Sequence, residues 1–136
     1  MKRLYPVVIA WFAIAQGACQ SRDTSRLSPE RDSVLAAEGV VRRAANVTFR
    51  YTHDGWEDRV ASIIVTRHRV LIYKNDKIGL EIKPSSRRGY DVAREADRVR
   101  ISAGTGKSRE IWSFVPPDSA AAWTESIRVV IKAAPP

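Results

Sequence analysis

Hydrophobic and polar residues alternate from Val47 onward in short runs that predict β-strands. In residues 47–53, Val47, Phe49 and Tyr51 share one face, and the residues between them are polar. A period of two is typical of a strand with one buried face. Six further runs follow at residues 59–66, 69–74, 77–83, 90–94, 98–102 and 109–115. We therefore predict a mainly β fold with seven antiparallel strands in a barrel or sandwich.

Turn signals and side-chain patterns refine this prediction. Asp54-Gly55 and Asn75-Asp76 are typical of hairpin turns. In residues 77–83 the alternation predicts that Gly79 points outward and that its apolar neighbours Ile78, Leu80 and Ile82 point inward. In the last strand, Trp112 and Phe114 are predicted to share the inner face.

Two helices are predicted, one before the strands and one after them. Ser28-Pro29-Glu30 is typical of a helix start, and Gly39 weakens the helical pattern, so a short helix is predicted over 29–38. After Pro116-Pro117, apolar residues recur near the helical period. This predicts a helix over 118–132, capped by Asp118, that closes one open end of the barrel with Trp123 as its largest buried side chain.

Residues 1–19 have the pattern of an export signal. Lys2 and Arg3 precede an apolar run of twelve residues, fewer than the about 20 that a membrane-spanning helix needs. Gly17-Ala18-Cys19 resembles the lipobox of bacterial lipoproteins, which implies a lipid on Cys19 and a place at the outer membrane or in the periplasm. Gln16 stands where that motif usually has an apolar residue, so a secreted protein without an anchor and a retained N-terminal anchor are the alternatives. Polar residues 20–33 are then expected to tether a domain over 34–134.

Charge and cysteine content narrow the possible partners. The net charge is +8, and it is +6 without the signal residues Lys2 and Arg3 (21 basic less 15 acidic residues). This excess favours anionic ligands, lipid headgroups or acidic partners, with a solvated basic surface as the alternative. Cys19 is the sole cysteine, which excludes an intramolecular disulfide. With His53 and His68 it supplies too few ligands for a zinc site, so no metal and no cofactor is predicted.

Residues 103–108 read AGTGKS and resemble the end of a phosphate-binding P-loop. That motif needs a glycine five positions before Gly106, where Ile101 stands, and a helix must follow it. A strand is predicted to follow instead. Gly104 and Gly106 supply the positive φ angles that a hairpin turn needs, so no nucleotide site is predicted.

The candidate binding surface consists of an aromatic residue and six arginines, namely Trp56, Arg67, Arg69, Arg87, Arg88, Arg98 and Arg100. Trp56 lies at the tip of the first predicted hairpin, where it either marks a contact surface or folds back over the barrel. Arg98 and Arg100 are predicted to share one solvent face. Aromatic residues do not alternate with these arginines, which argues against nucleic acid. His53 has acidic neighbours but no nearby nucleophile, so no catalytic site is predicted.

Seven strands and a C-terminal helix are the layout of the pleckstrin-homology (PH) superfold. Residues 64–74, IVTRHRVLIYK, and 111–131, IWSFVPPDSAAAWTESIRVVI, are similar to a strand pair and to the last strand and helix of bacterial PH-like domains. The resemblance extends over roughly 47–132 and implies a binding module. Many PH domains bind phosphoinositides beside the first hairpin, but here that loop carries Asp54, Glu57 and Asp58, which repel phosphates.

From sequence we therefore expect an exported lipoprotein whose PH-like domain binds an envelope protein or an anionic ligand without catalysis. An envelope-stress or enzyme-inhibitor lipoprotein is the first alternative. An enzyme of unknown class is the second. Neither nucleotide nor nucleic acid is an expected partner.

Overall fold

The computed structural model describes residues 23–53, 55–84, 89–104, 106 and 109–133. Within this part of the chain, two helices and seven strands follow in the order α2 Pro29–Glu38, β1 Val40–Thr52, β2 Trp56–Thr66, β3 Val70–Lys74, β4 Lys77–Ile82, β5 Tyr90–Glu95, β6 Arg98–Ala103, β7 Glu110–Phe114 and α3 Ala120–Ala133. The predicted fold class is confirmed, because the chain is mainly β, its strands pair antiparallel and a helix follows them.

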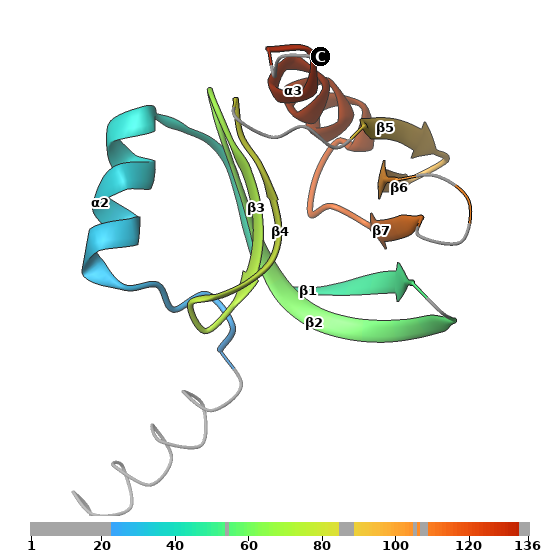
Figure 1. Cartoon of the computed structure of the whole chain (residues 1–136), viewed down its shortest axis with the longest axis horizontal. Coiled ribbons are helices and arrows are strands. Elements are labelled where there is room, and N and C mark those ends of the chain that lie inside the picture. The colour runs from blue at the N-terminus through green and yellow to red at the C-terminus, as the bar shows by residue number, and fades with distance from the viewer. Residues whose placement is uncertain (1–22, 54, 85–88, 105, 107–108, 134–136) are drawn as a thin grey trace, which may run out of the picture.

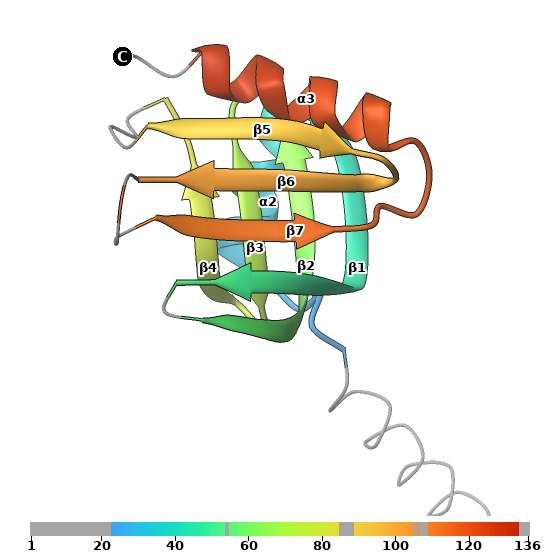
Figure 2. The same ribbon diagram turned by 90° about the vertical axis from the view of Figure 1, so that its right-hand side faces the viewer.

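The strands form one strongly curled sheet in the order β4-β3-β2-β1-β7-β6-β5. Figure 2 shows β5, β6 and β7 crossing in front of β1–β4, with α3 lying along the open end between the two layers. Strands β1 and β2 bend and take part in both layers, so the sheet is a half-barrel. In Figure 1, α2 lies on the outside of the curl, against the layer that contains β3 and β4.

Aromatic side chains fill the concave side of the sheet. The Phe49 ring meets Trp112 edge-on at a centroid distance of 5.7 Å and Phe114 at 5.0 Å. Phe114 in turn meets Trp123 of α3 at 5.7 Å, again edge-on. Edge-to-face packing of this kind adds to the gain from burying the rings. The predicted inward positions of Trp112 and Phe114 are confirmed, since both are buried.

Strand β1 begins at Val40, seven residues before the predicted start at Val47. The alternation fails because the pairing with β2 shifts between Ala44 and Val47, where β1 carries one extra residue. Asn46 lies in this bulge with φ of +56°. A β-bulge reverses the faces on which residues lie, so a search for period two recognises only the stretch beyond it.

A bulge in the β3–β4 pairing changes the predicted side of Ile78 at the start of β4. Leu80 and Ile82 are buried as predicted, but Ile78 is 43% exposed. The pairing of β3 with β4 shifts at Ile72/Tyr73, so Gly79 is the extra residue of the bulge and is itself exposed. A Cβ atom on Gly79 would lie 3.0 Å from Cη2 of Trp112. The prediction that Ile78 points inward is therefore wrong, whereas Gly79 is exposed as predicted but borders the Trp112 ring.

The predicted turn at Asn75-Asp76 and the positive φ angles predicted for Gly104 and Gly106 are both present. Asn75 and Asp76 both have positive φ, which is typical of a tight hairpin turn, and they join β3 to β4. Gly104 and Gly106 have φ of +81° and +59°, and the chain passes from β6 into antiparallel β7. The two described glycines of the stretch that resembles a P-loop thus lie between two antiparallel strands.

The N-terminal helix is confirmed at its predicted bounds, Pro29–Glu38, with Ser28 as its N-cap. Its buried face carries Leu35, which packs with Leu27 against Ile64, Leu71 and Tyr73 in a second, smaller apolar cluster. This cluster lies on the side of the sheet opposite the main core. Burial raises the pKa of Tyr73, whose hydroxyl donates to the Ser25 carbonyl at 3.1 Å.

Residues 23–33, which were expected to belong to a tether, pack on the domain instead. Thr24 is 3% exposed, and its Oγ1 lies 2.7 Å from Oγ of Ser62. The Thr24 backbone N–H donates to Oδ1 of Asn46 at 2.8 Å, and its carbonyl accepts from the Asn75 N–H at 3.1 Å. Small polar side chains hold this segment in place, and composition alone does not reveal such contacts.

Helix α3 begins two residues later than predicted. Its N-cap is Ser119, whose Oγ accepts from the Ala122 N–H at 3.1 Å, rather than Asp118. The Asp118 carboxylate instead accepts from Nε1 of Trp123 at 2.5 Å. Trp123 is buried, as predicted, between α3 and the core of the sheet.

Candidate functional site

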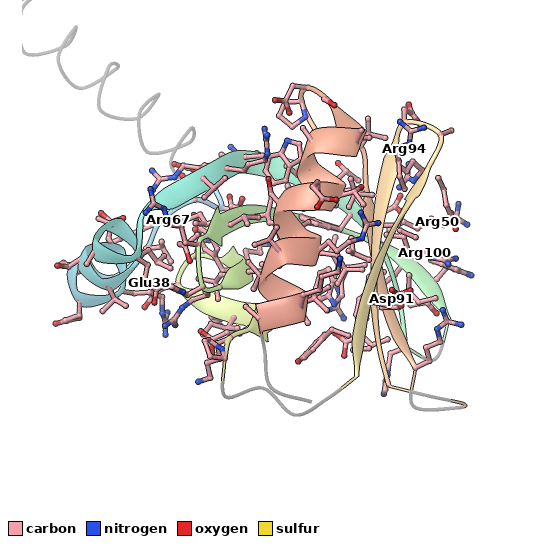
Figure 3. All side chains as sticks on the ribbon, turned by 90° about the horizontal axis from the view of Figure 1, so that it is seen from above. Glu38, Arg50, Arg67, Asp91, Arg94 and Arg100 are labelled. Carbon is pink, nitrogen blue, oxygen red and sulfur yellow. The ribbon has the colours of Figure 1, made fainter. Side chains whose placement is uncertain are left out.

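The described members of the predicted surface lie in two separate places. Figure 3 shows Arg67 beside α2, while Arg100 lies on the opposite side of the molecule together with Arg50. Trp56 begins β2, and Arg67 follows the other end of the same strand. These residues therefore do not converge on a single patch. Arg87, Arg88 and Cys19 lie outside the described residues.

Arg69 is engaged by two carboxylates within the fold. Its Nη2 and Nε donate to Glu38 at 2.8 and 3.1 Å, and its Nη1 donates to Glu81 at 2.9 Å. Burial alone would lower the pKa of Arg69, but the hydrogen bonds and charges of both carboxylates raise it. Arg69 thus ties the end of α2 to β4, which is a structural role.

Arg98 and Arg100 share the outer face of β6, as predicted, and Arg50 lies with them. Arg50 and Arg100 both pair with Ser113 of β7, so the two arginines flank it in one row across three strands. Nε of Arg98 donates to Oγ of Ser113 at 3.0 Å, and Arg100 forms an ion pair with Glu95 at 2.8 Å. The alternation in residues 47–53 puts Arg50 on the outer face, but it does not predict that β1 pairs with β7.

Trp56 is 54% exposed and does not fold back over the barrel. The guanidinium carbon of Arg50 lies 5.0 Å from the Trp56 ring centroid, within the range of a cation–π contact. His53 and His68 are exposed near opposite ends of β2. Within the described ranges, no three His, Cys, Asp or Glu side chains are grouped so as to hold a metal ion.

A groove of about 630 Å³, which we call the mouth groove, opens where β2 separates from β3. Strand β3 pairs with β2 only from Ser62 to Val65, so the earlier half of β2 continues past the end of β3. The groove lies between this part of β2 and the β3–β4 hairpin. The residues that give it its character are Asp58, Arg59, Ile72, Lys74, Lys77, Ile78, Gly79 and Trp112. In Figure 1 the β3–β4 turn lies at the end of the molecule away from α3.

Three cations face one carboxylate in the mouth groove. Arg59, Lys74 and Lys77 line it together with Asp58. Lys74 and Lys77 are both exposed and lie directly opposite each other across the β3–β4 hairpin. Like charges in this position destabilise a strand pair. This pair therefore favours binding of an anion between the two ammonium groups.

Aromatic rings hold the third cation of the groove. The Arg59 guanidinium carbon lies 3.9 Å from the Tyr51 ring centroid and 5.7 Å from the Trp112 ring centroid. Arg59 also forms an ion pair with Glu57 at 2.5 Å. Stacking on Tyr51 fixes the plane of the guanidinium group. Glu57 already accepts from the Nε and Nη2 side of this guanidinium, so an external carboxylate or phosphate would meet its other side.

The inner wall of the groove is apolar. Trp112 is 3% exposed, and its Nε1 donates to Oε1 of Glu110 at 2.6 Å, which fixes the orientation of the indole. Because Gly79 has no side chain, the benzo ring of Trp112 borders the groove. Ile72 and the exposed Ile78 extend this apolar wall. The site therefore combines a cationic rim with an aromatic wall.

The mouth groove was not predicted from the sequence, although part of its signal is visible there. Two lysines flank the predicted turn Asn75-Asp76, and a hairpin with a two-residue turn places them opposite each other. Their juxtaposition with Arg59 and Trp112 depends on the curl of the sheet and on the bulge at Gly79.

Comparison with known proteins does not assign the chain to a family. No protein-family model matches it, and no curated protein matches it. Among the described residues, no helix is both long and apolar enough to cross a membrane.

Proposed function

We propose that this chain is an exported envelope protein, anchored through a lipid on Cys19, whose PH-like domain is a non-catalytic module that binds an anionic ligand. Support for export and anchoring comes from the signal-like residues 1–19 and the lipobox-like Gly17-Ala18-Cys19. Support for the PH-like assignment comes from the strand order and from the helix that lies along the open end of the sheet.

The single observation that carries the binding function is the Lys74–Lys77 pair at the rim of the mouth groove, opposite Arg59. The fold tolerates the repulsion of two opposed ammonium groups where an uncharged pair would be more stable. An anion between them would remove that cost. The apolar wall formed by Ile78 and Trp112 suits a ligand whose negative group is joined to an apolar part.

Geometry near the N-terminus supports a place for the mouth groove close to the membrane. Only four residue steps separate Cys19 from Asp23, which span at most about 14 Å when extended. Thr24 is bound directly to Asn75 in the β3–β4 turn, between the two lysines. A lipid on Cys19 would hold this end of the domain close to the bilayer, so the anion can be the phosphate of a lipid headgroup or of a solute.

Phenyl phosphate is a suitable probe, because it joins a phosphate to an apolar ring. We expect it to raise the melting temperature of the mature protein at constant ionic strength. Lys77→Gln should be more stable than wild type without ligand, by about 0.2–1 kcal/mol, and should lose most of the response to phenyl phosphate. Lys132→Gln, which removes an exposed lysine of α3, is the matched control and should behave as wild type.

Two results separate the possible sources of the anion. Tighter association of the mature protein with phosphatidylglycerol vesicles than with phosphatidylcholine vesicles, lost in Lys77→Gln, would identify a lipid phosphate. A response to phenyl phosphate with no preference between the vesicles would identify a solute. An equal response of wild type and Lys77→Gln to both probes contradicts the proposal.

The anchor is tested separately by metabolic labelling with palmitate. Wild type should incorporate the label, and Cys19→Ala should not. Processing of wild type should also be blocked by globomycin, which inhibits the lipoprotein signal peptidase. Equal labelling of both chains would contradict the anchor while leaving the binding site untouched.

A further inference from the structure

Strand β1 has a long stretch that lacks a neighbour on one side. It pairs with β2 from Val40 to Thr52, but within the described ranges it pairs with β7 only at Arg50, Tyr51 and Thr52. On the side away from β2, the backbone before Arg50 therefore faces no strand. Arg42 is covered there by α3, because its Nε donates to Oγ of Ser126 at 2.9 Å.

Two prolines explain why β7 separates from β1 at this point. Ser113 pairs with Arg50, so a continued ladder would bring Val115 opposite Thr48 and Pro117 opposite Asn46. Proline has no N–H to donate, and Pro116-Pro117 ends the strand and directs the chain toward α3. The next position in the sheet beside β1 is thus left open by the chain itself.

A groove of about 590 Å³, which we call the edge groove, occupies this open position. Ala44 to Thr48 form one side of it, and Val115 and Pro117 form the other. Ala45 is exposed and small, so it leaves the adjacent backbone accessible. Val115 is 45% exposed and gives the far side an apolar surface.

We propose that the edge groove binds an extended, acidic peptide segment of a partner protein, which adds to the free edge of β1 beside the end of β7. A row of backbone donors and acceptors on a strand edge is matched by another extended polypeptide. This site is distinct from the mouth groove, and the proposal does not depend on what the mouth groove binds.

The basic side chains of the edge groove favour an acidic peptide segment. Arg50 and Arg98 line it, with Asp58 as the carboxylate among the lining residues. Arg98 is held in place by its bonds to Ser113, at 3.0 Å to Oγ and 3.3 Å to the carbonyl oxygen. A carboxylate on the guest would complete a charge-assisted contact with an arginine that is already oriented.

The bulge at Asn46 limits the guest to a short strand. The Asn46 N–H donates to Oγ of Ser62 at 3.3 Å, and its Oδ1 accepts from Thr24, so this residue is engaged within the domain. Bulges and charges on an edge also hinder pairing between identical chains. A second copy would add another Arg43 to the same edge, and this positive charge disfavours a β1–β1 dimer.

The proposal is tested by selecting random heptapeptides, displayed on phage, against the immobilised mature protein. We expect enrichment of peptides that contain Asp or Glu among β-branched residues. Their binding should fall at least tenfold with Val115→Asp, which places a carboxylate in the groove. Val129→Asp, at an exposed valine of α3, should leave it unchanged. N-methylation of the peptide backbone should also abolish binding, since it removes the ladder donors.

Three outcomes would overturn the proposal. One is that no acidic peptide is enriched. Another is that the enriched peptides bind Val115→Asp and Val129→Asp equally. The third is a concentration-dependent dimer in sedimentation that Val115→Asp abolishes, because this would identify a second copy of the chain as the occupant.

Discussion

Gly79 shows how a single missing side chain shapes the mouth groove. A Cβ atom there would lie 3.0 Å from Cη2 and 3.3 Å from Cζ2 of Trp112, a buried ring whose indole N–H is held by Glu110. The ring cannot retreat without disturbing Phe49, against which it packs. Glycine at this position is therefore required by close packing and not by an unusual backbone angle.

We predict that Gly79→Ala destabilises the domain by about 1–3 kcal/mol, the usual cost of overpacking a core. Urea denaturation followed by tryptophan fluorescence measures this loss. Gly55→Ala is the matched control, because nothing lies within 4 Å of a Cβ atom at Gly55. A Gly79→Ala protein as stable as Gly55→Ala would show that Trp112 is free to move.

Asp76 links stability to pH at the contact between the β3–β4 turn and α2. Its Oδ1 accepts from the Ser28 N–H at 3.0 Å and from the Arg31 guanidinium at 2.5 Å. The backbone hydrogen bond from Ser28, followed by the positive charge of Arg31, lowers the pKa of Asp76. A lowered pKa in the folded state means that ionisation of Asp76 favours folding.

We predict that Asp76→Asn lowers the melting temperature at neutral pH and has progressively less effect in acid. The contribution is complete above the ordinary aspartate pKa of about 3.9 and is lost as the pH falls through the lower folded-state value. Asparagine keeps the positive φ of this turn residue, so only the charge is tested. Asp97→Asn, in the β5–β6 turn, is the control. A gap between wild type and Asp76→Asn that persists at pH 2 would contradict the assignment.

Individual residues were predicted well where local pattern decides their place and poorly where distant contacts do. Trp112, Phe114 and Trp123 follow from alternation and helical period, and all three are buried. The roles of Arg69 and Asp118 depend on partners that the sequence does not reveal, since Glu38 lies 31 residues from Arg69.

Helix α3 shows at the scale of an element how a single amphipathic face closes the open end of the sheet. Trp123 and Ile127 are buried in the main core, while Val129 on the opposite side is 54% exposed. The helix contacts β5 and β6 as well as β1 and β2, so it bridges the two layers. Its loss would expose both layers at once.

We predict that Trp123→Ala costs about 3–5 kcal/mol, as is usual for the truncation of a large buried aromatic residue. Trp123→Phe should cost less, because a six-membered ring is kept while the five-membered ring and its bond from Nε1 to Asp118 are lost. Chemical denaturation measures both. Val129→Ala should change stability by less than about 0.5 kcal/mol, as exposed positions usually do. Equal losses for Trp123→Ala and Val129→Ala would mean that α3 contributes little to the core.

Elements were predictable where turn chemistry and periodicity agree. The glycines of the β6–β7 turn and the Asn75-Asp76 turn mark hairpins unambiguously, and the bounds of α2 follow from its N-cap and C-terminal glycine. The start of β1 and the facing of β4 were missed because a bulge interrupts each pattern. A bulge arises from pairing with another strand, so the sequence of one strand alone does not predict it.

At the scale of the whole molecule, residues 23–28 and α3 lie at different ends of the described part of the chain, as Figure 1 shows. If Cys19 carries a lipid, the short distance to Asp23 fixes which end of the domain faces the bilayer. The β3–β4 turn, which binds Thr24, would lie near the headgroups, and α3 would lie away from them. The domain would then be held against the membrane and not displayed on a long flexible tether.

We predict that a fluorophore on Lys77→Cys is quenched more strongly by headgroup-labelled quencher lipids than one on Val129→Cys. Lipidated protein reconstituted into vesicles permits this measurement, and an unlabelled vesicle supplies the baseline. Insertion of a twelve-residue Gly/Ser linker between Cys19 and Asp23 should abolish the difference between the two positions. Stronger quenching at Val129→Cys would show that the domain is turned the other way.

The attachment of Thr24 to the β1 bulge also determines how the domain responds to force. A pull on the N-terminus first loads the hydrogen bonds of Thr24 with Asn46 and Asn75. Once these break, the strain passes to α2, whose apolar cluster is separate from the main core. Residues 24–39 would then extend to about 50 Å before β1 bears any load. This segment would thus detach and unfold before the sheet does when the N-terminus is pulled.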